Sequence, residues 1–595
     1  MKFAFKPIAI AAALAVIGTA AVASPRTPGT YTAKVNGHNA PLTVEVTVDA
    51  NKILSIKTPD DQESLGVGKV GLKKTADNIL RYQSIGVDAV TGATFSSNAL
   101  KEGVEKCLKQ AGADMKQFTR KAEKHPIHNR TYQADVVVIG GGGAGLASAI
   151  SSMQAGAKKV IVLEKLGYVG GSTNVSEGAL NAVDDQRQKA QGIKDSYETF
   201  YETTMHGGHD KGDPTLVRFL TSHSMDAVNW LESLGVKFND HIGAATGSLG
   251  QRSHYPATPY GNTYIRTFEK VIADSNGKIQ VLLDTPAVKL IQNKSGRVVG
   301  VVGNNFGSKV TVMAKDGVII ATGGFGANVA YRQKVNTGVW KNIKLDNSIG
   351  CTNIQKAAQG QGLFLAQKVG AKLIGLSDIQ IHPCGTPGTG LMENIRTSGR
   401  NRIFVNSDGN RFVNEGAARD VLANAIFQQK GRTYWIVVNK LRYPTPDFKD
   451  RMGASIRNME ALGAVVEAPT LDELAKKTGM NAENLKKAIA DYNAVVSGKA
   501  KDKLGFVANN KDDKQMTEGP WYACRKVPTV HHTMGGIKIN VKSQVINTKG
   551  KVIPGLYAVG EVTGGIHGSN RLGGNAIADI MTFGHAVGPH IVQGK

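Results

Sequence analysis

Three glycines at the spacing G-x-G-x-x-G could hold the pyrophosphate of a dinucleotide. They are Gly140, Gly142 and Gly145, and they follow the apolar run 136–139. Glycines at this spacing allow a tight turn and let the start of the next helix approach the phosphates. Glu164 ends the next apolar run, about 20 residues further on, where an acidic side chain binds ribose hydroxyls. Because both flanks and the acid are present, the pattern predicts a dinucleotide site rather than a plain packing turn.

Three further clusters favour FAD over NAD as the dinucleotide, and we expect it to be bound non-covalently. Residues 165–173 would run along the cofactor. Residues 321–326 (Ala-Thr-Gly-Gly-Phe-Gly) resemble the second flavin-contacting turn of such proteins, and residues 555–565 resemble the strand and turn that contact the flavin ring. The FAD contacts expected in these clusters are Lys165, Gly171, Ser172, Thr173, Gly323, Gly324 and Glu561.

A second cofactor motif precedes the first. Residues 88–97 (Asp-Ala-Val-Thr-Gly-Ala-Thr-Phe-Ser-Ser) resemble the flavinylation motif of FMN-binding domains, in which a flavin transferase joins FMN to a threonine through its phosphate. The resemblance implies a covalent FMN phosphoester on Thr94 and a flavin transferase as a maturation partner. Two flavin sites in one chain indicate an electron relay that ends in a redox reaction.

The elements that must position these motifs suggest an α/β multidomain chain. The 595 residues can form several cores. A strand–turn–helix–strand pattern from residue 132 predicts a Rossmann-like domain, and charged helices at 471–496 mark an inserted unit. We expect a signal peptide at 1–23, a small α+β FMN-binding domain at 24–118, a linker at 119–131, an FAD-binding domain at 132–376 and 531–595, and an α+β capping domain at 377–530.

From residue 132 onward the chain resembles the soluble fumarate reductase and flavocytochrome c family, which includes urocanate reductases. The motifs that carry this resemblance are residues 411–415 (Arg-Phe-Val-Asn-Glu) with 419–420 (Arg-Asp), 531–536 (His-His-Thr-Met-Gly-Gly) and 567–575 (His-Gly-Ser-Asn-Arg-Leu-Gly-Gly-Asn). An FMN-binding domain in place of a haem domain resembles the urocanate-reductase branch. The resemblance adds Asn575, Ala576 and Ile577 to the expected FAD contacts.

The resemblance also implies a catalytic site. His531 and Arg571 would hold one substrate carboxylate, His382 would bind the other end of the substrate, and Arg419 would protonate the substrate carbon. The implied reaction moves a hydride from reduced FAD to the C=C bond of a small α,β-unsaturated carboxylate. An arginine is an unusual acid because its pKa exceeds about 12.

The chain departs from the family pattern in the proton relay. An ungapped count from Arg419 places the family's relay Glu and Arg on Ile395 and Ser398, whereas a shifted alignment places them on Glu393 and Arg396. Arg400 is the third candidate for a relay or substrate contact. This loop should line the distal end of the substrate pocket. The choice among fumarate, urocanate, methacrylate and a cinnamate therefore stays open.

Two other classes of function compete with the reductase. One is a non-catalytic flavin electron carrier, and the other is a dehydrogenase that runs the reverse reaction. Structural roles also compete for single residues: Arg419 could form an interdomain ion pair with Asp420, and His382 could be a buried core histidine. We expect His532 and Arg411 to be structural.

The net charge of the chain indicates its partners, and the N-terminal residues indicate its location in the cell. The net charge of +24 favours anionic substrates or an acidic redox partner, and no nucleic-acid-binding motif is present. Lys2, Lys6 and the apolar run after them, with cleavage between Ala23 and Ser24, predict export to the periplasm. The cysteine spacing matches no metal motif. Because the sequence shows neither a haem motif nor an evident NADH site, we expect a periplasmic or membrane-bound, quinol-linked cytochrome as the electron donor.

Overall fold

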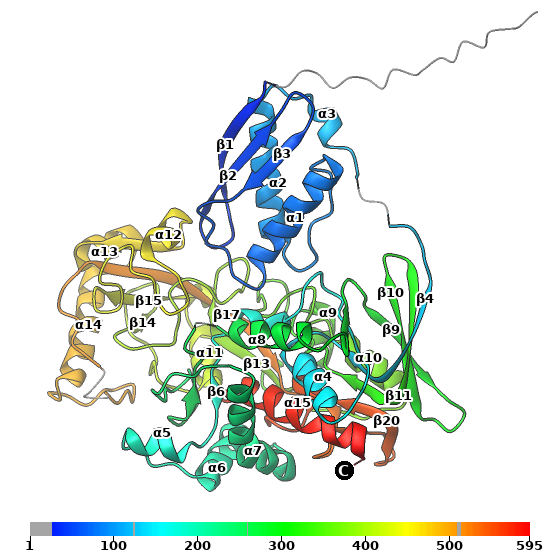
Figure 1. Cartoon of the computed structure of the whole chain (residues 1–595). Coiled ribbons are helices and arrows are strands. Elements are labelled where there is room, and N and C mark those ends of the chain that lie inside the picture. The colour runs from blue at the N-terminus through cyan, green and yellow to red at the C-terminus, as the bar shows by residue number, and fades with distance from the viewer. Residues whose placement is uncertain (1–26, 123–124, 259, 509–512, 595) are drawn as a thin grey trace, which may run out of the picture.

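The computed structural model describes residues 27–122, 125–258, 260–508 and 513–594, so the expected signal peptide lies outside the described residues. Its parts form three units, with the N-terminal unit standing above the other two (Figure 1). Within the described ranges, no helix is long and apolar enough to span a membrane.

The N-terminal unit is a three-stranded antiparallel sheet covered by helices on one face (Figure 1). In β2 every second residue is buried, which is the pattern of a strand with one face on a core. That face packs against α2, where Leu100 and Val104 are fully buried. The elements are β1 (Gly29–Asn36), β2 (Pro41–Val48), β3 (Ile53–Lys57), α1 (Gly68–Tyr82), α2 (Thr94–Gln110) and α3 (Met115–Phe118).

The second unit contains the eight-stranded sheet predicted from the Rossmann-like pattern. Its central strands run β20-β11-β4-β5-β8 and are all parallel to one another. Residues 136–138 of β4 are fully buried, as expected where helices cover both faces of a parallel sheet. These elements are β4 (Arg130–Ile139), β5 (Val160–Leu163), β8 (Ile279–Leu282), β11 (Ser308–Ile320), β20 (Val552–Ala558), α4 (Gly143–Gln154) and α15 (Asn575–Gln593).

Other elements of this unit extend the sheet, form a separate three-stranded and a separate two-stranded sheet, or are helices. They are η1 (Gly171–Val175), β6 (Leu180–Asn181), α5 (Asp185–Ala190), α6 (Tyr197–Gly207), α7 (Pro214–Ser233), β7 (Ser253–His254), α8 (Asn262–Ala273), β9 (Ala287–Gln292), β10 (Val298–Asn305), α9 (Val329–Val335), α10 (Gln361–Lys368), β12 (Leu373–Ile374), β18 (Gly536–Lys538), β19 (Gln544–Ile546), η3 (Gly560–Val562) and β21 (Thr563–Gly564).

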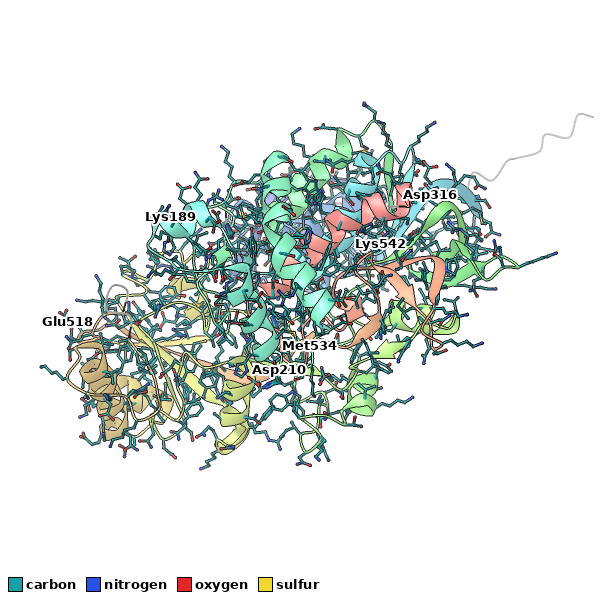
Figure 2. The ribbon with its side chains drawn as sticks, turned by 90° about the horizontal axis from the view of Figure 1, so that it is seen from below. Lys189, Asp210, Asp316, Glu518, Met534 and Lys542 are labelled. Atoms are coloured by element: carbon teal, nitrogen blue, oxygen red, sulfur yellow. The ribbon has the colours of Figure 1, made fainter. Side chains whose placement is uncertain are left out.

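The third unit is a five-stranded antiparallel sheet with its own helices. Its elements are β13 (Ile379–Gly385), β14 (Ile403–Val405), α11 (Arg419–Phe427), η2 (Lys430–Arg432), β15 (Tyr434–Asn439), α12 (Ile456–Ala461), β16 (Val465–Ala468), α13 (Leu471–Thr478), α14 (Ala482–Val496) and β17 (Trp521–Thr533). Strand β17 continues through residues 530 and 531, where the sequence analysis places a domain boundary. Met534, which follows β17, is 2% exposed and is seen towards the middle of the view in Figure 2, whereas Lys189 and Glu518 are seen at its edge.

Candidate active site

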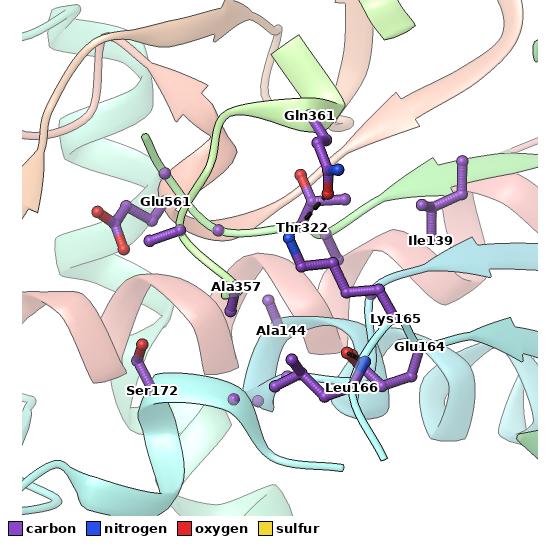
Figure 3. A pocket seen from close by; sticks show the side chains of 18 of the residues that line it. Ile139, Ala144, Glu164, Lys165, Leu166, Ser172, Thr322, Ala357, Gln361 and Glu561 are labelled. Atoms are coloured by element: carbon purple, nitrogen blue, oxygen red, sulfur yellow. Dashed lines mark hydrogen bonds between the residues drawn. The ribbon is translucent and has the colours of Figure 1, made fainter. Parts of the chain in front are cut away.

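The glycine-rich turn after β4 lines a narrow pocket of about 130 Å³ at the end of the parallel sheet (Figure 3). A Cβ atom on Gly142 would meet no atom within 4 Å, so this position leaves its side of the turn open. A Cβ atom on Gly145 would lie 1.8 Å from the carbonyl oxygen of Gly140, and Gly140 itself has a φ of +109°. Gly140 and Gly145 therefore allow the close turn, whereas Gly142 keeps the phosphate side of the pocket clear.

Glu164 joins this turn to the loop that follows β5. Its buried carboxylate accepts hydrogen bonds from the Gly141 amide at 2.6 Å and the Leu166 amide at 2.7 Å. Burial raises the pKa of Glu164. Burial also lowers the pKa of Lys165 to about 8, and the Lys165 ammonium donates to Gln361 Oε1 at 2.8 Å. Figure 3 shows Glu164, Lys165 and Leu166 together on one side of the pocket, with Ser172 and Glu561 towards the other.

These residues fit an FAD molecule, because a cleared turn, a helix N-terminus and a buried acid are what a dinucleotide requires. Of the expected contacts, Gly145 does not line the pocket and acts through packing. Asn575 does not line the pocket either. It is fully buried, and its side chain accepts from Asn181 Nδ2 at 2.8 Å and donates to Thr204 Oγ1 at 3.3 Å. The expected contacts that line this pocket are Gly140, Gly142, Glu164, Lys165, Gly171, Ser172, Thr173, Gly323, Gly324 and Glu561.

A larger cavity of about 1150 Å³ adjoins the first pocket, with which it shares lining residues including Ser172 and Glu561. All three units contribute to its walls. Thr94 lines it from the N-terminal unit, and Ala576 and Ile577 line it from the start of α15. The four residues predicted to be catalytic, His382, Arg419, His531 and Arg571, all line this cavity.

Arg419 is the first residue of α11, and its side chain is held in a fixed position. Its Nε donates to the carbonyl oxygen of Thr246 at 3.1 Å, and its Nη1 donates to Gln380 Oε1 at 3.0 Å. Burial lowers the pKa of Arg419 to about 10, against the opposing charge of Glu177. The guanidinium is thus closer to the range in which it can release a proton than an exposed arginine is.

Arg571 provides the second buried cation. Its Nη1 donates to the carbonyl oxygen of Leu572 at 3.0 Å, and its buried Nε has no hydrogen-bond partner among the described residues. Burial, and then the charge of Arg419, lower the pKa of Arg571 well below its ordinary value. In the described parts of the chain, neither guanidinium forms an ion pair with a carboxylate. An anion bound between them would relieve this unbalanced charge.

His531 reaches the cavity through a β-bulge. Gln380 pairs with His532 and Ile381 pairs with Val530, so His531 is an extra residue in β17. Such a bulge redirects a side chain. The Thr352 hydroxyl lies 2.6 Å from His531 Nδ1 and is therefore placed to fix the orientation of this ring.

His382 lies beside His531, with the two ring centroids 4.7 Å apart. The Cys384 amide donates to His382 Nδ1 at 3.1 Å, so the proton of the neutral ring is on Nε2. Burial, and then nearby cations, lower the pKa of both histidines well below the ordinary value. Both rings are consequently neutral, and His382 offers Nε2–H as a hydrogen-bond donor.

The three relay candidates do not lie together. The Glu393 carboxylate lies 2.9 Å from His38 Nε2 of the N-terminal unit, and Arg396 Nη1 lies 3.7 Å from Glu177 Oε1. Both Glu393 and Arg396 line the large cavity. Arg400 instead pairs with Asp513 at 3.0 Å and lies outside the cavity, so the structure does not support it as a relay or substrate contact.

Sequence reasoning missed two residues of this site, Gln380 and Glu177. Gln380 is 2% exposed and contacts both arginine-bearing segments. Glu177 lines the cavity and accepts a hydrogen bond from Ser398 Oγ at 3.1 Å. The position of Gln380, two residues before His382 on one strand and so on the same face, was the available signal. No local signal marked Glu177.

Two residues were expected to be structural. Arg411 has buried charged partners, whereas His532 lines the large cavity and its Nε2 has no hydrogen-bond partner among the described residues. Arg411 pairs with Glu415 at 2.7 Å and with Asp502 at 2.8 Å, away from the cavity. His532 is 4% exposed, and its Nδ1 lies 3.9 Å from Glu561 Oε1. Burial lowers the pKa of His532 well below its ordinary value.

Thr94 lines the same cavity as the first residue of α2, and it is exposed. The free backbone N–H groups at the start of a 17-residue helix favour a phosphate there. Ser96, two residues further on, is buried and donates to Glu63 Oε2 at 2.7 Å. The residues present therefore fit an FMN phosphate on Thr94.

Comparison with known proteins identifies two domains and several relatives. Residues 135–577 match the family described as "FAD binding domain", and residues 37–109 match "FMN-binding domain". The chain is 34% identical to a urocanate reductase of Eggerthella lenta over 94% of this chain and 91% of the relative. It is 38% identical to a cytochrome-containing fumarate reductase of Shewanella frigidimarina over 76% of both chains.

Two further matches complete this comparison. The chain is 34% identical to an NADH:acrylate oxidoreductase of Vibrio harveyi over 94% of this chain, but it spans only 61% of that relative's length. The solved open conformation of a flavocytochrome c3 fumarate reductase is similar at a TM-score of 0.63 and 34% identity, with 78% of each chain covered.

Proposed function

Since the chain belongs to the family of FAD-binding oxidoreductases that includes fumarate and urocanate reductases, and since it carries an FMN-binding domain as well, we propose that it reduces the C=C bond of a small α,β-unsaturated carboxylate. The observation that carries this proposal is the pair of buried guanidinium groups of Arg419 and Arg571. Both line one cavity with Glu561, an FAD-pocket residue, and neither has a carboxylate partner in the described part of the chain.

Substrate binding would fall to Arg571 and the two neutral histidines. The guanidinium of Arg571 offers charged donors to a carboxylate, and His382 offers Nε2–H. If the Thr352 hydroxyl donates to His531 Nδ1, His531 also presents a donor at Nε2. Neutral donors add hydrogen bonds without adding further charge to a buried cationic site. These contacts would orient the substrate and stabilise enolate-like charge as it develops.

Arg419 would supply the proton to the substrate carbon. Its hydrogen bonds to Thr246 and Gln380 fix the guanidinium, and its lowered pKa makes proton release less costly than from an exposed arginine. Because the side chains of His382, Arg419 and Arg571 are buried, bulk water would have little access to the reacting atoms beside them. When bound, FAD supplies the hydride, and FMN on Thr94 would supply FAD with electrons.

The proposal also covers the location of the protein, its electron donor and its substrate. We propose a periplasmic enzyme that receives electrons from a periplasmic or membrane-bound, quinol-linked cytochrome, with fumarate- and urocanate-type acids as candidate substrates. Relatives named as fumarate, urocanate and acrylate reductases support this substrate class. The guanidinium groups of Arg419 and Arg571, which line the cavity, support an anionic substrate.

An anaerobic assay tests the proposal. Reduced viologen dye is mixed with the enzyme and, in turn, fumarate, urocanate, acrylate, methacrylate and a cinnamate. Oxidation of the dye with at least one acid is expected. No oxidation with any of them, from enzyme that contains FAD, would leave the electron-carrier alternative. Reduction of an acceptor dye by a saturated acid, without the forward reaction, would favour the dehydrogenase.

A further inference from the structure

The N-terminal unit meets the rest of the chain around the rim of the large cavity. His38 Nε2 lies 2.9 Å from Glu393 Oε1, and Asn458 Nδ2 donates to Gln62 Oε1 at 2.8 Å. Asn174 Nδ2 donates to the carbonyl oxygen of Gly66 at 3.3 Å. The five side chains in these contacts all line the cavity. The contacts therefore encircle an open space and do not fill it.

The segment just before Thr94 is packed onto the loop that borders the FAD pocket. Val90 and Ala93 form one apolar cluster with Leu166 and Tyr168, and the Tyr168 hydroxyl donates to the carbonyl oxygen of Gly92 at 3.1 Å. Leu166 also lines the FAD pocket. This packing fixes the start of α2 at the mouth of the cavity shared with the active site.

Several large apolar side chains line the cavity together with Thr94. Phe95 and Leu65 are 65% and 47% exposed, although they are large apolar side chains, and both face this space. Met392 and Met452 line it from the capping unit, and methionine adapts to the shape of a bound group. A typical ligand pocket measures roughly 300–1,000 Å³, so a cavity of about 1150 Å³ exceeds what a small carboxylate needs.

We propose that this space is the seat of the isoalloxazine ring of FMN attached to Thr94, with Phe95 and Leu65 on one side, Met392 and Met452 on the other, and His38 at its polar edge. This inference rests on the proposed attachment of FMN to Thr94. A flat aromatic ring tethered at Thr94 matches both the position and the apolar character of the walls.

His38 is held rigidly relative to the attachment point. Its ring centroid lies 5.6 Å from that of Phe95. Glu63 accepts from the His38 amide at 2.6 Å and from the Ser96 hydroxyl at 2.7 Å, so one carboxylate ties the His38 loop to the first turn of α2. The loop that carries His38 is consequently fixed relative to the first turn of α2.

His38 would bring a positive charge to the edge of the ring. Burial alone would lower the pKa of His38, but the hydrogen bond and charge of Glu393 raise it to about 9, with smaller contributions from Asn39 and Glu63. The Lys526 ammonium contacts the backbone carbonyl oxygen of Glu393 from the capping side. A cation beside the flavin stabilises its reduced, anionic form and therefore raises its reduction potential.

The test uses the full chain with both flavins, produced together with a flavin transferase. Flavin fluorescence of the denatured protein band reports covalent FMN, and an anaerobic potentiometric titration at pH 7 reports the potentials. Thr94→Ala protein supplies the FAD-only reference spectrum. The variants are His38→Gln and Met452→Glu, which alter charge on opposite walls. The control Lys109→Gln removes a charge from the far end of α2, where Lys109 pairs with Glu105.

Each cavity variant is expected to keep the fluorescent band and to have a lower FMN potential than the wild type. The FAD potential of each variant, and both potentials of the Lys109→Gln control, are expected to equal those of the wild type. The expected shift is at least tenfold in the two-electron equilibrium, or about 30 mV. A fluorescent band with an unchanged FMN potential in both variants would overturn the ring seat. A non-fluorescent wild-type band would instead overturn the attachment to Thr94, on which the ring seat depends.

Discussion

Gln380 holds Arg419 in place: Arg419 Nη1 donates to Gln380 Oε1 at 3.0 Å. The same carboxamide donates through Nε2 to Asn570 Oδ1 at 2.8 Å and to the carbonyl oxygen of Arg571 at 2.7 Å. One buried side chain thus sets the position of the proposed acid relative to the proposed carboxylate clamp. The two arginines come from segments about 150 residues apart, so this relation depends on tertiary structure.

Gln380→Leu is expected to lower kcat by about 100-fold, because a small misplacement of a catalytic group has an effect of that order. The leucine keeps the bulk but cannot hold the guanidinium. Both flavins should remain bound, as absorbance spectra and the fluorescence of the denatured band would show. Gln367→Leu, at an exposed position of α10, is the control. An unchanged kcat in Gln380→Leu would reject the positioning role.

Arg419→Lys is expected to reduce turnover by at least about 10²-fold while both flavins stay bound. Lysine keeps the charge but lacks the planar fork that reaches Thr246 and Gln380 together. Single-turnover reduction by dye, followed by addition of substrate, separates loss of chemistry from loss of cofactor. Turnover near the wild-type rate would show that another group donates the proton.

Glu177→Gln should shift the alkaline limb of the pH–rate profile to lower pH. Burial lowers the pKa of Arg419 to about 10, and the charge of Glu177 partly opposes that fall. An acid must be protonated, so activity declines as pH rises through this pKa. Removing the negative charge lowers the pKa further, and the decline then begins earlier. Glu202→Gln, on an exposed face of α6, should leave the profile where it was. A shift to higher pH would contradict this electrostatic account.

Much of the cofactor machinery could be predicted from the sequence because it is local. The glycine turn and the segment around Thr94 each place their contacts within a few residues, and the FAD- and FMN-binding domains and the α/β fold class are confirmed. The loop 393–400 shows where prediction from the sequence fails. Side-chain direction in an irregular segment follows no periodicity, so nothing indicated that Arg400 turns towards Asp513.

Contacts between residues far apart in the sequence could not be predicted, for a different reason. Glu177 meets Ser398, 221 residues away, and Gln380 joins Arg419 to Arg571, which lie 39 and 191 residues away. The bulge that separates His531 from His532 depends on the register between β13 and β17, which neither strand specifies alone.

Arg411→Met is expected to destabilise the capping unit without affecting the flavins. Arg411, Glu415 and Asp502 are all buried, and removing the shared cation leaves two carboxylates unpaired. Breaking a buried ion pair in this way costs about 3–5 kcal/mol. Calorimetry would show a lower unfolding temperature. Arg457→Met breaks an exposed ion pair with Asp447 and should change the unfolding temperature little. Loss of turnover at full stability would instead assign Arg411 to the chemistry.

Thr94→Ala should separate electron entry from substrate reduction. The variant lacks the hydroxyl that forms the proposed phosphoester, so the denatured protein band is expected to lose its flavin fluorescence. FAD should remain, because its pocket contains no residue of α2.

The rate with reduced membranes of the host as donor should then fall by at least tenfold relative to wild type. The rate with reduced viologen should fall less, since a small dye can reach FAD directly. Asn98→Ala, on the exposed side of α2, controls for damage to the helix and should keep both the fluorescent band and the membrane-linked rate. Because FAD and the Arg419 site are intact in all three proteins, a membrane-linked rate that survives in Thr94→Ala would mean that electrons reach FAD without passing through this residue.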